Sequence, residues 1–241
     1  CNLAYWLAEE QGKRVLVVDL DGQGNATDCL TGGMHSRGVE DAAPYSETIL
    51  TMGAAYAMEY PDIDVRDVSC ASKISTRVVL LPGGDGLFDL GDRLERVDAL
   101  AQFLCSEDNR NQFDFVLIDC PPEFNFAVLN AIEASDQLII PTTDGVASRK
   151  GAACVIGELQ GDDYDVRVTA LPVMWRANSV TPEAMCDLEE ELGCELLPEV
   201  VRWTPKAGEA DRMNELLALY SPTCRASLSY RALARRLVRG R

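Results

Sequence analysis

Three aspartates stand at the ends of two apolar runs, where their side chains could do chemistry. Asp19 and Asp21 close the run VLVVDLD, and Asp119 closes the run FDFVLID just before two prolines. In open α/β sheets, ligands bind beyond the carboxyl ends of the strands. An aspartate in that place can orient a hydrated Mg²⁺ ion against the phosphates of a nucleotide. The alternative is that each aspartate caps the turn that follows its strand.

Apolar patterning predicts the elements that would position these aspartates. Short continuous apolar runs are typical of strands buried on both faces of a parallel sheet, and apolar residues at helical spacing indicate helices. We expect strands at 14–20, 78–81, 113–119, 137–141 and 166–173, and helices at 2–11, 86–104, 124–134, 146–159 and 209–220, with one more that opens at Thr181-Pro182 and a basic one at the C-terminal end. The stretch 21–51 is expected to be a loop with a short helix. Strands that alternate with helices predict an α/β fold, a doubly wound and mostly parallel sheet with helices on both faces.

The composition indicates one soluble domain over residues 1–241. Hydrophobic residues make up 47% and charged residues 25%, enough for one substantial core. No apolar run approaches the roughly 18 residues of a membrane span. Nine cysteines without a C-x-x-C pair favour free thiols in a reducing cytosol. The net charge of −17 gives no global attraction to nucleic acid, so any DNA binding requires a local basic patch.

Several segments resemble the ParA/Soj ATPases of the ParA/MinD superfamily, which are deviant-Walker P-loop proteins. VLVVDLDGQGNAT resembles their D-x-D-P-Q-G-N segment, and FVLIDCPPEFNFAVLNAIEASDQLIIP resembles their Walker B region. CNLAYWLAEEQGKRV resembles the helix that follows their K-G-G-V-G-K-T-T loop. VVLLPGG resembles the family's strand between these two regions. Weaker similarity in VVRWTPKAGEA and SPTCRASLSYRALARRLV extends the resemblance over nearly the whole chain, although it is faint between 31 and 75.

This resemblance implies a role for each aspartate. Asp21 matches the second aspartate of the deviant Walker A′ element, which positions the attacking water, and its alternative is a turn residue before Gly22. Asp119 matches the Walker B aspartate that orients Mg²⁺ through water, and Asp19 supports the local network. The remaining nucleotide-site positions are Gln23, Gly24 and Asn25 of the first switch loop, Pro121, and, by position alone, Asn178 and Pro205 near the adenine. Gly22 stands where the family usually has proline, a departure expected to loosen the loop.

The phosphate loop of this family does not occur in the sequence. G-x-x-x-x-G-K-[ST] supplies a backbone nest for the β-phosphate, a lysine, and a hydroxyl for Mg²⁺. We expect the first strand and the Walker A loop to precede the helix at 2–11 in the parent protein, which leaves this chain inactive by itself. The alternative is a non-enzymatic paralogue that has lost the loop and acts as an interaction partner.

Basic residues gather near the C-terminal end. The resemblance implies non-specific DNA binding there, and the candidates are Lys206, Arg225, Arg231, Arg235 and Arg239. Three of them share one face of the last predicted helix, at i, i+4 and i+8. The alternative is a solvated face on a helix that packs against the core. Membrane binding ranks lower, because the apolar stripe of this helix is short and lacks Phe and Trp.

The function that the resemblance implies is an ATP-dependent partitioning switch for plasmid or chromosome segregation. Two subunits would form a homodimer with ATP and Mg²⁺, bind DNA without sequence preference, and hydrolyse ATP when a ParB-like protein stimulates them. The expected location is cytoplasmic, in association with the nucleoid. A MinD-like membrane-positioning ATPase is a further alternative.

Overall fold

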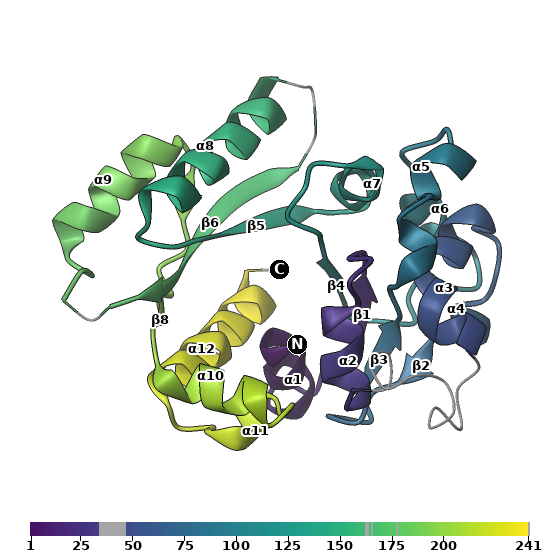
Figure 1. Cartoon of the computed structure of the whole chain (residues 1–241), viewed down its shortest axis with the longest axis horizontal. Helices are drawn as coiled ribbons and strands as arrows, with labels where there is room; N and C mark the ends of the chain where they lie inside the picture. Colours follow the sequence, from purple (N-terminus) through teal and green to yellow (C-terminus); the bar gives the residue numbers. More distant parts are fainter. Residues whose placement is uncertain (34–46, 162–163, 165, 177, 241) are drawn as a thin grey trace. The chain divides into compact units, whose positions relative to one another are not determined.

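The computed structural model describes residues 1–33, 47–161, 164, 166–176 and 178–240. The chain divides into two compact units. Unit 1 contains Cys1–Ala134 and Asn214–Leu216, and unit 2 contains Ser135–Met213 and Leu217–Arg241. Each unit combines a mostly parallel sheet with helices (Figure 1), which confirms the α/β prediction. The single domain expected over 1–241 stays a prediction, and residues 34–46 of the expected loop after the first strand lie outside the described residues.

The sheet of unit 1 is built around a buried central strand. Its strands are β1 (Val15–Asp19), β2 (Cys70–Ala71), β3 (Val78–Leu81) and β4 (Phe115–Asp119). The order is β2-β3-β1-β4, with β1 parallel to both β3 and β4 and the short β2 antiparallel to β3. All five residues of β1 are buried, as the unbroken apolar run predicts for a strand covered on both faces.

Helices cover both faces of this sheet. They are α1 (Asn2–Glu9), α2 (Asn25–Thr31), α3 (Glu47–Glu59), α4 (Val65–Val68), the 3₁₀ helix η2 (Asp85–Leu87), α5 (Leu90–Arg93), α6 (Ala99–Cys105) and α7 (Phe126–Glu133). Figure 1 shows α3, α4 and α6 on the opposite side of β1 and β3 from α1. Leu16 and Val18 of β1 pack in one core with Met58 and Phe103 from these helices.

The helix predicted over 86–104 is wrong as one continuous element. The chain instead forms η2, α5 and α6, with Leu94 in an extended conformation between the last two. Gly86 and Gly91 lower the helix stability of this stretch, because glycine has the most backbone entropy to lose. The apolar spacing alone did not reveal these interruptions.

The described strands of unit 2 also pair in parallel. Its strands are β5 (Gln137–Thr142), β6 (Arg167–Trp175), β7 (Glu195–Leu196) and β8 (Val201–Arg202). Its helices are α8 (Val146–Gly161), α9 (Pro182–Leu192), α10 (Pro205–Arg212), α11 (Leu217–Tyr220) and α12 (Arg225–Arg239). β6 pairs in parallel with β5, β7 and β8. In Figure 1, α8 and α9 lie side by side over β5 and β6.

Local signals explain where two helices of unit 2 begin and end. Thr181 caps α9 as predicted, because its side chain accepts a bond from the Ala184 N–H at 3.2 Å, and Pro182 opens the helix. The helix predicted near 209–220 is instead split into α10 and α11. Asn214 between them has φ +50°, a left-handed conformation that asparagine tolerates but a helix cannot contain.

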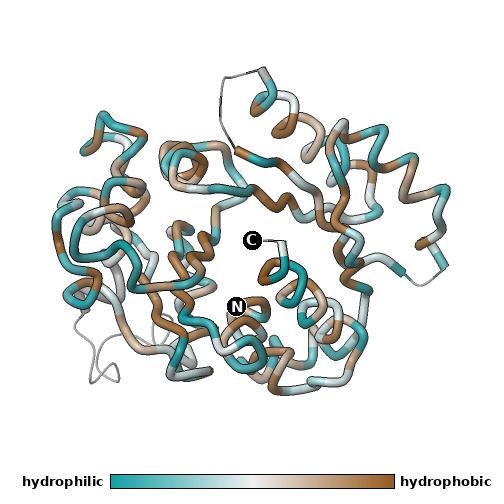
Figure 2. The backbone as a smooth tube through the Cα atoms, turned by 180° about the vertical axis from the view of Figure 1, so that it is seen from behind, coloured by the Kyte–Doolittle hydropathy of each residue, from teal (hydrophilic) through white to brown (hydrophobic). Residues whose placement is uncertain are grey.

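Hydropathy follows the strands and one amphipathic helix. Figure 2 shows hydrophobic colour along the strands of both units, while α12 alternates between hydrophobic and hydrophilic residues. Leu233 and Ala234 of α12 are buried, whereas Arg235 and Arg239 are exposed. Among the described residues, no helix has the length and apolarity needed to cross a membrane.

Candidate nucleotide site at the carboxyl ends of β1 and β4

The three aspartates meet at one end of the unit 1 sheet. Asp19 stands opposite Asp119 in the register of β1 and β4. The chain then stays beside β4 for one more residue, because the Leu20 N–H donates to the Asp119 carbonyl at 2.8 Å. Asp21 follows, close enough that its charge helps to raise the pKa of Asp119. The parallel sheet therefore gathers the carboxylates that the sequence singled out.

Asp19 is a buried anchor for the loop after β1. Its side chain is fully buried, and Oδ1 accepts the Asp21 N–H at 3.1 Å. Oδ2 accepts both the N–H and the hydroxyl of Thr27, at 2.8 and 2.7 Å. Burial raises the pKa of Asp19, and the bonds from Thr27 and Asp21 oppose that rise. Asp19 therefore holds Asp21 in place, while a direct contact with nucleotide stays a prediction.

The hydroxyl of Thr27 extends this anchor to β3. It accepts the Gly83 N–H at 3.0 Å, which connects the loop after β3 to the first turn of α2. A Cβ atom built on Gly83 would lie 2.6 Å from the Asp19 carbonyl oxygen and 2.8 Å from that of Asp21. Sequence reasoning missed both Thr27 and Gly83 as site residues. The available signal for Gly83 was the Gly-Gly pair just beyond β3.

Asp21 forms a tight turn with the residues that follow it. Its Oδ1 accepts the Gln23 N–H at 2.9 Å, and its carbonyl accepts the Gly24 N–H at 2.9 Å. Gly24 has φ +64°, which favours glycine, and it caps α2, so that Asn25 begins the helix. Gln23 and Asn25 are exposed, and Asp21 is half-buried. The predicted switch loop is therefore an ordered turn with outward-facing polar side chains.

Asp119 is exposed to solvent at the end of β4, yet the surrounding protein removes part of the hydration of its carboxyl. Loss of hydration raises the pKa of its carboxyl, and the negative charge of Asp21 adds to that rise. Cys1, which directly precedes α1, lies within electrostatic reach of Asp119, so the N-terminal end of α1 is near this carboxylate. The positive end of a helix dipole favours anions such as phosphate.

The donor chemistry of this corner fits a Mg²⁺ ion shared with a phosphate. Mg²⁺ takes oxygen ligands, and it usually combines one or two carboxylates with water and substrate phosphate. Asp21 and Asp119 supply such carboxylates, and their mutual repulsion is what a divalent cation would relieve. Within the described part of the chain, no group of three or more His, Cys, Asp or Glu could hold a metal by itself.

The other predicted site residues lie at several places. Pro121 is half-buried in the loop directly after β4. Asn178 and Pro205 belong to unit 2, where Asn178 is exposed in the turn after β6 and Pro205 begins α10. Their roles stay predictions.

The predicted DNA contacts are concentrated on α12. Arg225, Arg235 and Arg239 are exposed there, and Arg231 is half-buried. Lys206 lies on α10 instead, where its Nζ pairs with Glu209 at 2.7 Å.

Parallel strands that end in paired aspartates, with a helix N-terminus beside them, are typical of nucleotide-binding α/β proteins. The family model described as an AAA domain matches residues 1–161, and the chain belongs to that family.

Known relatives refine this class. The chain is 29% identical to an uncharacterised protein of Pseudomonas putida, over 99% of this chain and 88% of the relative. It is 24% identical to the chromosome partitioning protein ParA of Caulobacter vibrioides, over 94% and 83%. The septum site-determining protein MinD of Pyrococcus horikoshii, solved with Mg-ADP, shares the fold with a TM-score of 0.71 and 20% identity, over 98% and 87%. The chain is thus a ParA/MinD-type P-loop ATPase.

Proposed function

We propose that this protein is a nucleotide-switched partitioning ATPase that acts in plasmid or chromosome segregation. The observation that carries the proposal is the meeting of Asp21 and Asp119 beside the N-terminal end of α1. The relatives add support, since one is a chromosome partitioning protein and another fixes the position of a septum.

Each residue of the corner would have a distinct task. ATP and Mg²⁺, when bound, supply the phosphoryl group and neutralise its charge. Asp119 would hold the Mg²⁺ through water, and Asp21 would accept a hydrogen bond from the water that attacks. Asp19 and Thr27 would keep Asp21 in place through the bonds already described. The N-terminal end of α1 would face the phosphates.

The phosphate loop would come from a strand that pairs with β4. β4 is the outer strand on its side of the unit 1 sheet, and Val116 in its middle is 37% exposed. Among the strands that the structure describes, an outer strand of this kind is where another strand could be added to the sheet. The coding sequence upstream of Cys1 tests this proposal. An in-frame K-G-G-x-G-K-T segment would support it and would contradict the loop-less paralogue.

The switch itself would act on DNA. We infer that ATP joins two subunits, that the dimer binds DNA through α12, and that a ParB-like partner triggers hydrolysis and release at the nucleoid. Support comes from the exposed Arg225, Arg235 and Arg239 on α12, in a chain whose other charges are mainly acidic.

Gel-shift titrations of the full natural protein test this function. ATP should produce a shift of unrelated DNA duplexes, whereas ADP and nucleotide-free protein should not. Equal binding in all three conditions would contradict a nucleotide switch. If the protein does not shift DNA but floats with anionic vesicles, the result would favour the membrane-positioning alternative.

A further inference from the structure

An exposed aromatic ring covers the backbone of Gly22, between Asp21 and Gln23. Phe88 is 62% exposed, whereas Gly22 is buried. A Cβ atom built on Gly22 would lie 2.7 Å from both Cε1 and Cζ of the Phe88 ring. The ring therefore occupies the space that any side chain at position 22 would need. A large exposed hydrophobic residue in this contact calls for a functional explanation.

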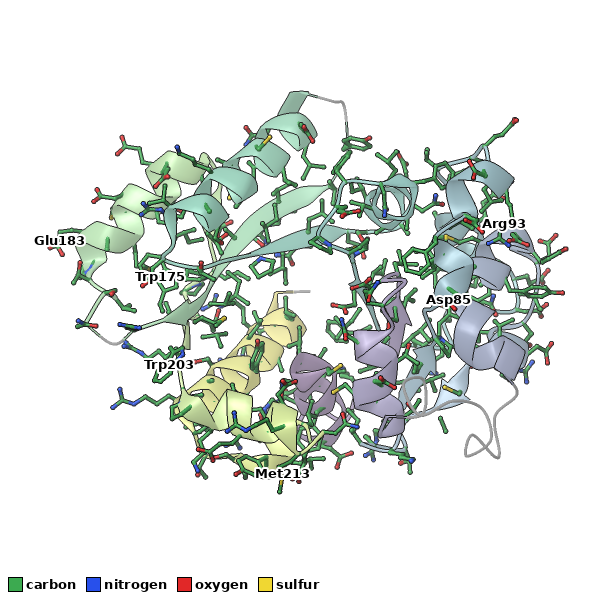
Figure 3. The ribbon with its side chains drawn as sticks, in the orientation of Figure 1. Asp85, Arg93, Trp175, Glu183, Trp203 and Met213 are labelled. Atoms are coloured by element: carbon green, nitrogen blue, oxygen red, sulfur yellow. The ribbon has the colours of Figure 1, made fainter. Side chains whose placement is uncertain are left out.

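The backbone that presents Phe88 is firmly held. Its N–H donates to the Asp85 carbonyl at 3.2 Å, and the preceding Leu87 is part of the unit 1 core. The Arg93 guanidinium donates to the Gly86 carbonyl and pairs with Glu59 of α3. Figure 3 shows Asp85 of η2 and Arg93 of α5, which lie on either side of Phe88 in the sequence. The ring thus extends from a fixed turn.

The segment after β3 contacts the segment after β1, which is a short loop followed by α2, at two points. In the interior, the Gly83 N–H donates to the Thr27 hydroxyl at 3.0 Å. At the surface, the Phe88 ring lies on Gly22. Asp21 directly precedes Gly22, and its Oδ1 accepts the Gln23 N–H across Gly22.

We propose that Phe88 is a positioning residue for Asp21, because its ring clamps the Gly22 turn. Glycine has the largest backbone freedom of all residues, whereas a proline would fix φ by its own ring. The Phe88 ring supplies by packing the restriction that Gly22 lacks. It keeps the turn from Asp21 to Gln23 closed and the Asp21 carboxylate in one orientation. This role rests on the proposed function, in which Asp21 orients the attacking water.

The test is a double-mutant cycle in the full natural protein with Phe88→Ala, Gly22→Ala and both together. The ring is the free end of an exposed side chain, so it should rotate away in Gly22→Ala. Both single variants and the double variant should therefore lose about tenfold in kcat for ATP, with little change in KM. Phe88→Tyr keeps the ring and should retain wild-type kcat.

Amide hydrogen exchange supplies a readout that does not depend on hydrolysis. Exchange at residues 21–25 should accelerate in Phe88→Ala and Gly22→Ala, and it should stay at the wild-type rate in Phe88→Tyr. Two controls make the same kinds of change elsewhere in the chain. Gly151→Ala adds a methyl with nothing within 4 Å, and Tyr60→Ala deletes another exposed aromatic ring, 53% exposed.

Wild-type kcat and exchange in Phe88→Ala would overturn the proposal, and so would single-variant losses that simply add in the double variant. If the wild-type protein hydrolyses no ATP, the proposed function fails. The exchange rates alone then decide the clamp, since faster exchange in Phe88→Ala supports it and unchanged exchange refutes it.

Discussion

At the scale of single residues, the buried carboxylate of Asp19 sets the geometry of the site. A charged group without water needs hydrogen-bond donors, and Asp19 receives three, two of them from Thr27. The Thr27 hydroxyl also accepts the Gly83 N–H, so one oxygen atom satisfies two buried groups. This explains why a threonine stands in the first turn of α2.

Thr27→Val tests that shared oxygen. The valine keeps the shape of threonine but leaves the Gly83 N–H without its acceptor and Asp19 with one donor fewer. We expect the free energy of unfolding to fall by about 2–4 kcal/mol. Urea unfolding measures the change. Thr27→Ser keeps the hydroxyl and should lose only about 1 kcal/mol, and equal losses in both variants would contradict the network.

Asp119 gives the site a pH signature. Its folded-state pKa is raised above the usual 3.8, so the folded protein binds this proton more tightly than the unfolded chain does. The stability contribution of Asp119 therefore falls as the pH rises from 3.8 through the raised value. At neutral pH the folded protein loses free energy of unfolding by keeping the Asp119 carboxyl charged. Asp119→Asn removes this charge and should therefore raise Tm at neutral pH.

Thermal melts of wild type and Asp119→Asn across this pH range check the sign. The difference in Tm should shrink as the pH falls through the raised pKa and below 3.8, where the wild-type carboxyl becomes protonated in both states. A difference that is the same at every pH would show that the charge of Asp119 is not its source.

At the scale of elements, Asn109 fastens α4 to α6. It is 4% exposed, its Oδ1 accepts the Val65 N–H at 2.8 Å, and its Nδ2 donates to the carbonyls of Ile63 and Phe103, each at 2.9 Å. Asn109→Ala leaves these backbone groups unpaired, and we expect a loss of about 2–4 kcal/mol in urea unfolding. Thr181→Ala, which removes only the cap of α9, should cost about 1 kcal/mol. An Asn109→Ala cost no larger than that of Thr181→Ala would contradict the fastening role.

The elements differ in how well the sequence predicts them. β1 and β3 follow from unbroken apolar runs, which are typical of strands buried on both faces. β4 follows from a similar run, but the expected burial on both faces is wrong for it, since only Phe115 of this strand is buried. β7 and β8 have two residues each, too few for any periodicity. The break between α5 and α6 was also missed, since apolar spacing outweighed the glycines.

The residues of the candidate site also differ in how well the sequence predicts them. Asp21 and Asp119 could be predicted, because each carries its signal in the adjacent strand. Thr27 and Gly83 could not be paired in advance, since they are 56 residues apart and meet only when β1 and β3 lie side by side. The contact between Gly22 and Phe88 has no local signal either.

At the scale of the whole molecule, charge decides how DNA could be bound. The net charge is −17, so a duplex is repelled except where basic side chains gather. The exposed Arg235 and Arg239 of α12 supply such a place. We expect Arg235→Glu/Arg239→Glu to weaken ATP-dependent DNA binding by tenfold or more, about 1.4 kcal/mol.

Gel-shift titration at fixed salt measures this effect. Arg77→Glu/Arg110→Glu changes the net charge equally at two exposed arginines of unit 1 and should bind nearly as the wild type does. Unaltered binding by the α12 variant would exclude this helix as the DNA contact. Equal weakening by both variants would show that only net charge matters.

ATP turnover by Asp21→Ala in the full natural protein tests the central claim most directly, because Asp21 is assigned to water and not to nucleotide binding. We predict that Asp21→Ala still binds ATP and loses at least about 10²-fold in kcat, while Asp62→Ala, at an exposed aspartate between α3 and α4, turns over as the wild type does. Wild-type turnover by Asp21→Ala would contradict the account.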